Sequence, residues 1–114
     1  MPNLYTEIEI AASKSQVWSA LYEKQYWFKW NTFLWDRDPS QRFILNQKVT
    51  LAVRRTSHEP ETVFQPLIQT LKPEICLAWK SEIPGFSNQT WFELQEIGFN
   101  RTQYILRYSG THYS

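Results

Sequence analysis

The sequence has little cysteine, little glycine and almost no excess of either charge. Because Cys76 is the single cysteine among 114 residues, no internal disulfide can form, and its apolar neighbours in "ICLAW" predict a buried thiol. Twelve basic and eleven acidic residues leave a net charge of +1. Nucleic-acid binding is therefore disfavoured, since it depends on a strongly basic surface.

Long hydrophobic runs are also missing, and none approaches the roughly 20 residues that a transmembrane helix requires. The N-terminal "MPNLYTEIEI" lacks the charged and apolar regions of a signal peptide. A membrane-surface helix needs a basic face, for which the aromatic-rich segment offers only Lys24 and Lys29. We therefore predict a cytoplasmic protein without membrane insertion, folded as a single domain over residues 1–114.

Aromatic residues, in contrast, are abundant at 17% of the chain. Four of the six tryptophans, Trp18, Trp27, Trp30 and Trp35, lie within residues 16–35. Such a cluster suits an ordinary core, a pocket for an apolar ligand, or a surface that meets a partner. The helical spacing of Trp18 predicts a core position, whereas the polar neighbours of Trp27 and Trp35 predict partial exposure.

The order of the predicted elements indicates an α+β fold. Alternation in "LYTEIEI" predicts a half-buried strand, and Ser13 followed by Gln16 forms the capping-box pattern of a helix start. This helix is expected to end near residues 23–25, and a second short helix is expected over residues 26–33. Antiparallel strands are expected over residues 49–54, 62–71, 75–83, 89–97 and 102–109, the last two joined as a hairpin around "GFNR". Pro66 predicts an edge position or a bulge.

Five stretches, in order, carry a resemblance to a known family: "IEIAASKSQVWSAL", "YWFKWNTF", "LKPEICLAWKSEIPGF", "TWFEL" and "YSGTHY". They are similar to the polyketide cyclase/dehydrase branch of the START-like (Bet v 1-like, SRPBCC) superfamily, from about residue 4 to residue 110. The resemblance implies a helix-grip fold, in which a curved antiparallel sheet grips a long C-terminal helix around a hydrophobic cavity.

The sequence departs from the family pattern at its end, because no residues for the long helix follow "SGTHYS". An uncovered apolar sheet face would be a large exposed patch, which monomers rarely carry. We expect a partner subunit to cover this face as a homodimer, the alternatives being the first helices or a longer native product.

Candidate binding residues come from the two faces of the predicted strands. Residues of consistent parity are expected on the concave side, where they line a ligand or fill the core: Leu51, Val53, Leu77, Trp79, Phe92, Leu94, Tyr104, Leu106 and Tyr108. The resemblance adds Trp30 and Phe33 at the cavity mouth. The hydroxyls of Tyr104 and Tyr108 are candidates to orient the polar end of a ligand.

Catalytic and metal-binding patterns are scarce. His58 lies in a polar turn, His112 lies three residues from the C-terminus, and no cluster has metal-ligand spacing. Neither a phosphate loop nor a dinucleotide fingerprint occurs, so no cofactor is predicted. Arg54 or Arg107, if turned inward, would instead bind an acidic head group.

Three functions follow from these patterns. We favour non-catalytic binding of a small hydrophobic molecule, such as a lipid, isoprenoid or polyketide-like compound, in a groove between sheet and helices. The second is a cyclase/dehydrase-type enzyme, which would need an inward titratable group. The third is a protein-interaction or dimerisation module that uses the uncovered sheet face.

Overall fold

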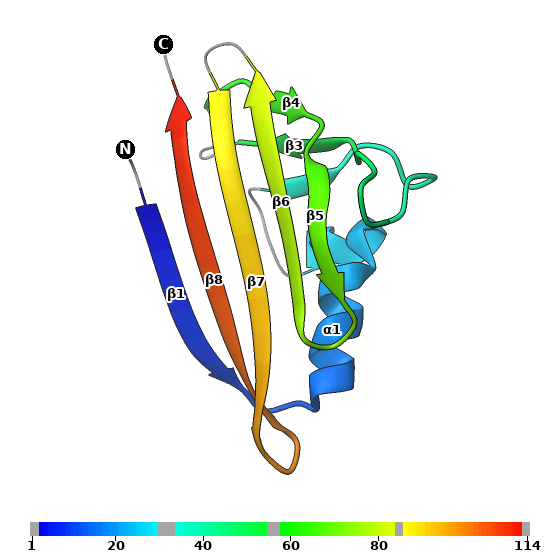
Figure 1. The fold of residues 1–114 in the computed structure, drawn as a ribbon, viewed down its shortest axis with the longest axis vertical. Helices are drawn as coiled ribbons and strands as arrows, with labels where there is room; N and C mark the ends of the chain where they lie inside the picture. The colour runs from blue at the N-terminus through cyan, green and yellow to red at the C-terminus, as the bar shows by residue number, and fades with distance from the viewer. Residues whose placement is uncertain (1–2, 30–33, 55–57, 84–85, 113–114) are drawn as a thin grey trace.

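The computed structural model describes residues 3–29, 34–54, 58–83 and 86–112 as an α+β fold (Figure 1). Its elements are β1 (Asn3–Ile10), α1 (Lys14–Tyr22), η1 (Lys24–Lys29), β2 (Leu34–Asp36), β3 (Leu51–Val53), β4 (Thr62–Phe64), β5 (Leu67–Lys72), β6 (Cys76–Ile83), β7 (Phe86–Gly98) and β8 (Arg101–His112). A five-stranded antiparallel sheet has the order β1-β8-β7-β6-β5, and a three-stranded sheet has the order β2-β3-β4.

The helix α1 begins where the capping pattern predicts. The Ser13 hydroxyl accepts a hydrogen bond from the Gln16 amide at 3.2 Å, and the Gln16 side chain accepts one from the Ser13 amide at 2.9 Å. Val17, Trp18 and Leu21 are buried, so the predicted core position of Trp18 is confirmed. In place of the second helix expected over residues 26–33, the described part of the chain has the 3₁₀ segment η1, which starts directly after α1.

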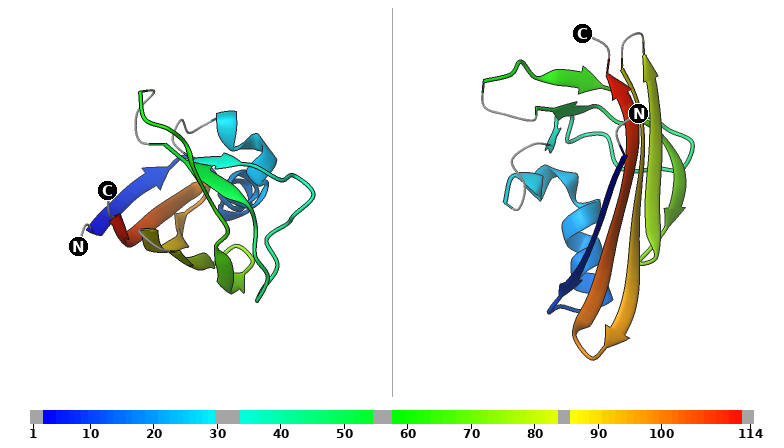
Figure 2. Two further views of the ribbon diagram at one scale, coloured as in Figure 1. Left: turned by 90° about the horizontal axis from the view of Figure 1, so that it is seen from above. Right: turned by 90° about the vertical axis from the view of Figure 1, so that its left-hand side faces the viewer.

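The molecule has two layers, with α1, η1 and the small sheet all on one side of the large sheet (Figure 2). We call this side of the large sheet the inner face and the opposite side the outer face. Strand register places Trp79, Thr90 and Tyr108 side by side across β6, β7 and β8 on the inner face. Leu77, Phe92 and Leu106 form the next such row.

Aromatic rings join the two layers. The Trp79 ring lies 6.2 Å from Trp27, 5.9 Å from Phe43 and 5.2 Å from Phe92, measured between ring centroids. Trp27 is only 1% exposed, and its indole N–H donates to the Leu21 carbonyl at 2.9 Å. The partial exposure predicted for Trp27 is therefore wrong, because η1 turns the indole toward the sheet despite its polar sequence neighbours.

Trp35, in contrast, is half-buried, as its sequence context predicts. Its ring lies under two guanidinium groups, with the Arg54 carbon 5.1 Å and the Arg37 carbon 5.9 Å from the ring centroid. Arg37 is also paired with Glu61, whose pKa it lowers by hydrogen bonding. Cation–π contacts of this kind stabilise the small sheet from its outward side.

Pro66 marks the point where the chain leaves one sheet for the other. The single strand expected over residues 62–71 is divided into β4, at the edge of the small sheet, and β5, at the edge of the large one. Proline has no amide hydrogen for a sheet ladder, so it suits this junction. Its carbonyl still accepts a hydrogen bond from the Val49 amide at 3.2 Å.

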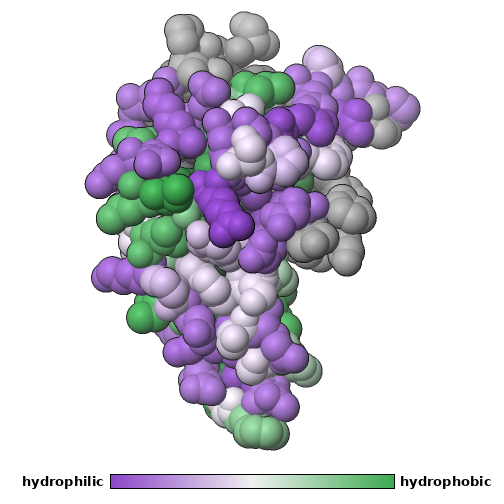
Figure 3. All heavy atoms as spheres, turned by 90° about the vertical axis from the view of Figure 1, so that its right-hand side faces the viewer, coloured by the Kyte–Doolittle hydropathy of each residue, from purple (hydrophilic) through white to green (hydrophobic). Residues whose placement is uncertain are grey.

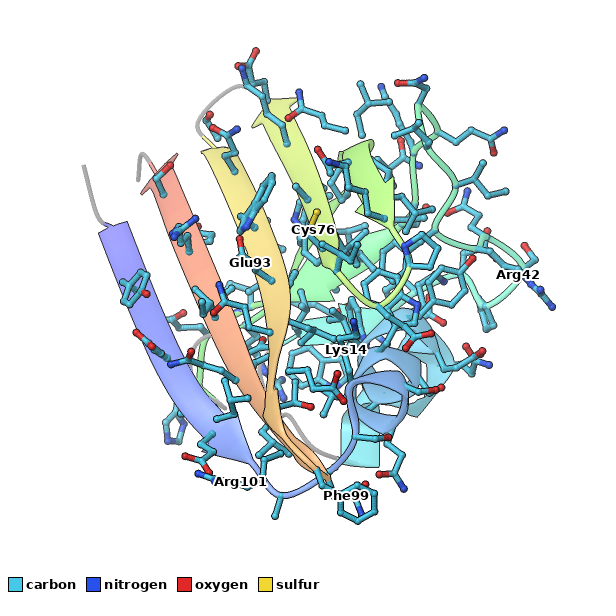
Figure 4. All side chains as sticks on the ribbon, turned by 60° about the horizontal axis from the view of Figure 1, so that its bottom comes forward. Lys14, Arg42, Cys76, Glu93, Phe99 and Arg101 are labelled. Carbon is cyan, nitrogen blue, oxygen red and sulfur yellow. The ribbon has the colours of Figure 1, made fainter. Side chains whose placement is uncertain are left out.

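The strands β7 and β8 form the hairpin expected around "GFNR". Gly98 pairs with Arg101, and Phe99 and Asn100 form the turn, Asn100 with a positive φ of 51°. Asparagine adopts this left-handed conformation more readily than most residues. Phe99 is 91% exposed at the tip of the hairpin (Figure 4).

A buried ion pair connects η1 to β2. The Lys24 ammonium and the Asp36 carboxylate are in direct contact, and both side chains are almost fully buried. Lys24 also donates to the Asp38 carbonyl at 2.6 Å, and the Asp38 amide donates to Asp36 at 3.0 Å. The pair therefore fixes where the chain enters the small sheet after α1 and η1.

Substitution of Lys24 by Met tests this role, because it leaves the Asp36 carboxylate buried without its cation. We expect the free energy of unfolding, measured by urea denaturation, to fall by about 3–5 kcal/mol. The double variant K24M/D36L removes both charges and should lose much less than the two single variants together. A loss below about 1 kcal/mol for Lys24→Met, as exposed pairs give, would contradict a structural role for the pair.

Candidate functional site

The predicted binding residues divide into a closed group and an open group on the described part of the chain. Five of them are buried in the core: Leu51, Leu77, Trp79, Phe92 and Leu94. Four are only partly buried at its margin: Val53, Tyr104, Leu106 and Tyr108. The remaining two, Trp30 and Phe33, lie outside the described residues. The inner face is thus filled by aromatic side chains in one half and less covered in the other.

The open half of the inner face belongs to β1 and β8. Ile8 is 48% exposed and pairs with Tyr104, while Thr6 pairs with Leu106. We define the open strip as those inner-face residues of the two strands that are partly buried or exposed, namely Thr6, Ile8, Ile10, Tyr104, Leu106 and Tyr108. In Figure 1, β1 lies at the edge of the large sheet, opposite the side where α1 and the small sheet are seen, and α1 contacts β7 and β8.

Tyr104 links the open strip to the core. Its ring lies 6.1 Å from that of Phe92, and burial raises the pKa of its hydroxyl well above the ordinary value. The hydroxyl therefore stays protonated at neutral pH, so that it can donate a hydrogen bond but is a poor general base.

Beyond Tyr108, the inner face becomes polar. Ser81, Asn88 and Thr90 are all buried there, and Asn88 pairs with both Ser81 and Gly110. We define the polar end as Trp79, Ser81, Asn88, Thr90, Tyr108 and Gly110. Sequence reasoning missed Ser81 and Asn88, although the alternation that marks Trp79 and Phe92 extends to them along β6 and β7.

Neither Arg54 nor Arg107, the two arginines considered as inward-facing ligands for an acidic head group, faces the open strip. Arg107 lies on the outer face, where its guanidinium carbon is 5.7 Å from the Tyr5 ring centroid. The inward alternative for Arg107 is wrong, because its neighbours Leu106 and Tyr108 occupy the inner positions of β8. Arg54 lies over the Trp35 ring in the small sheet.

Catalytic groups do not converge on the inner face in the described residues. Among these residues, no three His, Cys, Asp or Glu side chains cluster as metal ligands. His58 is exposed, and the side chain of His112 is not among those described. Cys76 is buried, as predicted, on β6 opposite Glu93 (Figure 4), and burial raises the pKa of its thiol.

Two surface hollows are also present. One of about 520 Å³ lies between the small sheet and β5–β6, with Lys48, Val63 and Lys80 among its lining residues. Another of about 490 Å³ includes Tyr5, Trp91 and Arg107, from three adjacent strands. Seen from the side of β5, the surface is mostly hydrophilic, with hydrophobic side chains gathered toward the outer face (Figure 3). The first hollow is bordered by Lys48, Lys80 and Glu82 and includes Ser81. The second is mostly apolar, with Arg107 as its charged residue, and includes Thr90 and Tyr108.

Comparison with solved structures shows which fold this is. A START superfamily protein from Mycobacterium smegmatis is 15% identical, with a TM-score of 0.76 over 98% of this chain and 78% of that one. Protein CV1439 from Chromobacterium violaceum is 10% identical, with a TM-score of 0.75 over 96% and 79%. The Aha1 dimer from Colwellia psychrerythraea is 21% identical, with a TM-score of 0.66 over 100% and 80%.

No protein-family model and no curated protein matches the sequence. At the identities above, the likeness to solved structures concerns the fold alone. The chain has the START-like (Bet v 1-like) fold that its sequence resembles, with an antiparallel sheet and one α-helix in the described residues. No helix in that part of the chain is long and apolar enough to span a membrane.

Gly110 allows a prediction about the polar end. A Cβ atom added there would lie 2.7 Å from both the Ser87 carbonyl oxygen and the Tyr108 hydroxyl. We expect Gly110→Ala to lower the free energy of unfolding by about 1–3 kcal/mol, as overpacking does. Gly98→Ala is the matched control, because its nearest contact would be an ordinary 3.6 Å. Equal losses in the two variants, measured by urea denaturation, would contradict the close approach at Gly110.

Proposed function

We propose that the protein binds a small hydrophobic molecule against the open strip, without catalysing a reaction. The observation that carries this proposal is the half-open row of apolar side chains beside a closed aromatic core. Ile8 is 48% exposed, although it lies on the same face as the buried Phe92 and Leu94. Covering such a surface with an apolar ligand stabilises the complex by roughly 25 cal/mol for each Å² removed from water.

The START-like fold supports this proposal, because its members' sheets present one face to a cover of helices, and here that face is incompletely covered by described residues. A cyclase/dehydrase-type reaction receives less support. It would need a titratable group near the open strip with a pKa close to neutrality. Tyr104, whose pKa is raised, is poorly suited as a base. The cytoplasmic location stays a prediction.

An uncharged hydrophobic dye tests the proposal. Nile red should bind saturably to the wild-type protein with an increase in fluorescence. Ile8→Gln should weaken its binding about tenfold, because the lost apolar contact is worth roughly 1.5 kcal/mol. Tyr5→Gln is the matched control, since Tyr5 lies three residues away on the outer face and is 55% exposed. Its affinity for the dye should equal that of the wild type.

Sedimentation velocity on the same samples separates a ligand from a second copy of the chain. If a ligand occupies the open strip, the homodimer expected from the sequence does not cover this strip, and the wild type and Ile8→Gln should sediment alike. A dimer that Ile8→Gln dissociates, together with the absence of saturable dye binding, would show that a partner subunit covers the open strip. That result would replace ligand binding by the dimerisation function.

A further inference from the structure

We infer that the polar end holds an uncharged hydrogen-bonding group of the ligand, such as an alcohol or a phenol. This inference rests on the proposed function and adds the chemistry of the ligand's head to it. The ligand would be amphipathic, with its apolar body along the open strip and its polar group between β6, β7 and β8.

Three buried polar atoms at this place have no hydrogen-bond partner within the described structure. They are the indole nitrogen of Trp79, the hydroxyl of Ser81 and the side-chain carbonyl oxygen of Asn88. Ser81 and Asn88 are each 3% exposed and face each other across β6 and β7. Buried polar groups in folded proteins nearly always have partners, and each one left without a partner is costly. Three on one face therefore indicate a missing partner.

The Tyr108 hydroxyl also lies near these atoms, because Gly110 has no side chain that would block it. The Tyr108 hydroxyl lies 2.7 Å from the position that a Cβ of Gly110 would occupy. Gly110 is the direct strand partner of Asn88, so the hydroxyl reaches over the same row as Asn88 and Ser81. Glycine thus leaves room for a phenol to lean toward the polar end.

Tyr108 belongs to both the open strip and the polar end. It is only partly buried, whereas Asn88 and Ser81 are enclosed. A ligand that follows the open strip meets Tyr108 first and reaches Asn88 when the phenol ring turns aside. Rotamer changes of partly exposed side chains are fast, so this step does not prevent binding.

The atoms at the polar end require a group that both donates and accepts hydrogen bonds. An indole N–H can only donate, an amide oxygen can only accept, and a serine hydroxyl can do either. A hydroxyl group on the ligand has both capacities. A methyl group has neither, and a carboxylate cannot donate to Asn88.

The placement of the charged residues of β6 is a second argument against an ionised head group. On β6, the nearest charged residues, Lys80 and Glu82, alternate with Trp79 and Ser81 and so belong to the outer face. They are exposed and pair with each other at 2.9 Å. On β6, therefore, no charged side chain shares the inner face with the polar end, and burying an ionised group without a counter-ion is strongly unfavourable.

The length of the open strip indicates the size of the apolar body. Tyr108 and Tyr104 lie four residues apart on β8, a span of about 13 Å at roughly 3.3 Å per residue. Ile8, paired with Tyr104, lies at the far end of this span. An extended chain of about ten carbons matches this length, whereas a naphthalene covers only the part of it next to Tyr108.

Three naphthalene derivatives of similar size and shape test the inference, with their affinities measured by equilibrium dialysis at neutral pH. They are 2-naphthol, 2-methylnaphthalene and ionised 2-naphthoate. We expect the wild type to bind 2-naphthol about tenfold more tightly than 2-methylnaphthalene, the worth of one good buried hydrogen bond. 2-Naphthoate should bind more weakly than either.

Asn88→Leu keeps the approximate volume of the side chain and removes the acceptor. It should abolish the preference for 2-naphthol while 2-methylnaphthalene still binds. If Asn88→Leu does not fold, the smaller change Ser81→Ala replaces it in the same experiment. Ser81→Ala should reduce the preference for 2-naphthol several-fold. Gln89→Leu is the control, because Gln89 is the neighbouring residue of β7 and lies exposed on the outer face.

The outcomes separate this inference from the proposed function. If none of the three compounds binds, both are overturned. If 2-methylnaphthalene binds as tightly as 2-naphthol, ligand binding stands and the inference is overturned, since buried water would then satisfy the polar end. Tighter binding of 2-naphthoate would also overturn it, because the head group would then be met by a positive charge.

Discussion

The two layers of the protein meet at the indole ring of Trp79, and the remaining packing depends on this contact. Trp27 from η1, Phe43 from the loop before β3, and Phe92 from β7 all place their rings around it. Aromatic pairs at these distances contribute beyond the area that they bury. They attach the small sheet and the 3₁₀ segment to the β6–β7 half of the large sheet, and the buried pair of Lys24 and Asp36 fixes how the two covering elements are joined.

This concentration of aromatic side chains has a consequence for the rest of the inner face. Rings that fill the β6–β7 half leave little cover for β1 and β8, so Ile8 is exposed and Tyr104, Leu106 and Tyr108 are only partly buried. The two surfaces lie on adjacent strands, and a single row of paired residues, Leu94, Tyr104 and Ile8, passes from the buried to the exposed part. The core and the proposed site are therefore two parts of one continuous apolar surface.

Local patterns predicted the local structure well. The capping box at Ser13 and the turn at Phe99–Asn100 depend on hydrogen bonds between near neighbours in sequence, and both are present. The START-like fold was also anticipated from five short stretches spread along the chain, and the solved structures with this fold confirm it. Strand parity placed the candidate residues of β6, β7 and β8 on one face.

Features that depend on tertiary contacts were missed. Exposure was predicted for Trp27, but its indole packs against the Trp79 ring in the core. The division at Pro66 into two sheets depends on which strand each half meets, and β2 is too short to give an alternation pattern. Ser81 and Asn88 were overlooked because polar residues near strand ends are usually solvated, and only the structure shows that they are buried.

The central claim is that the ligand lies on the inner face of β1 and β8. The most direct measurement is a set of intermolecular nuclear Overhauser effects between 2-naphthol and the side chains of the labelled protein. The account predicts contacts from the naphthalene ring to the methyl groups of Leu106 and Thr6, which are paired across β8 and β1. Contacts to Tyr5 and Trp91 instead would place the ligand in the hollow that these residues line and would contradict the account.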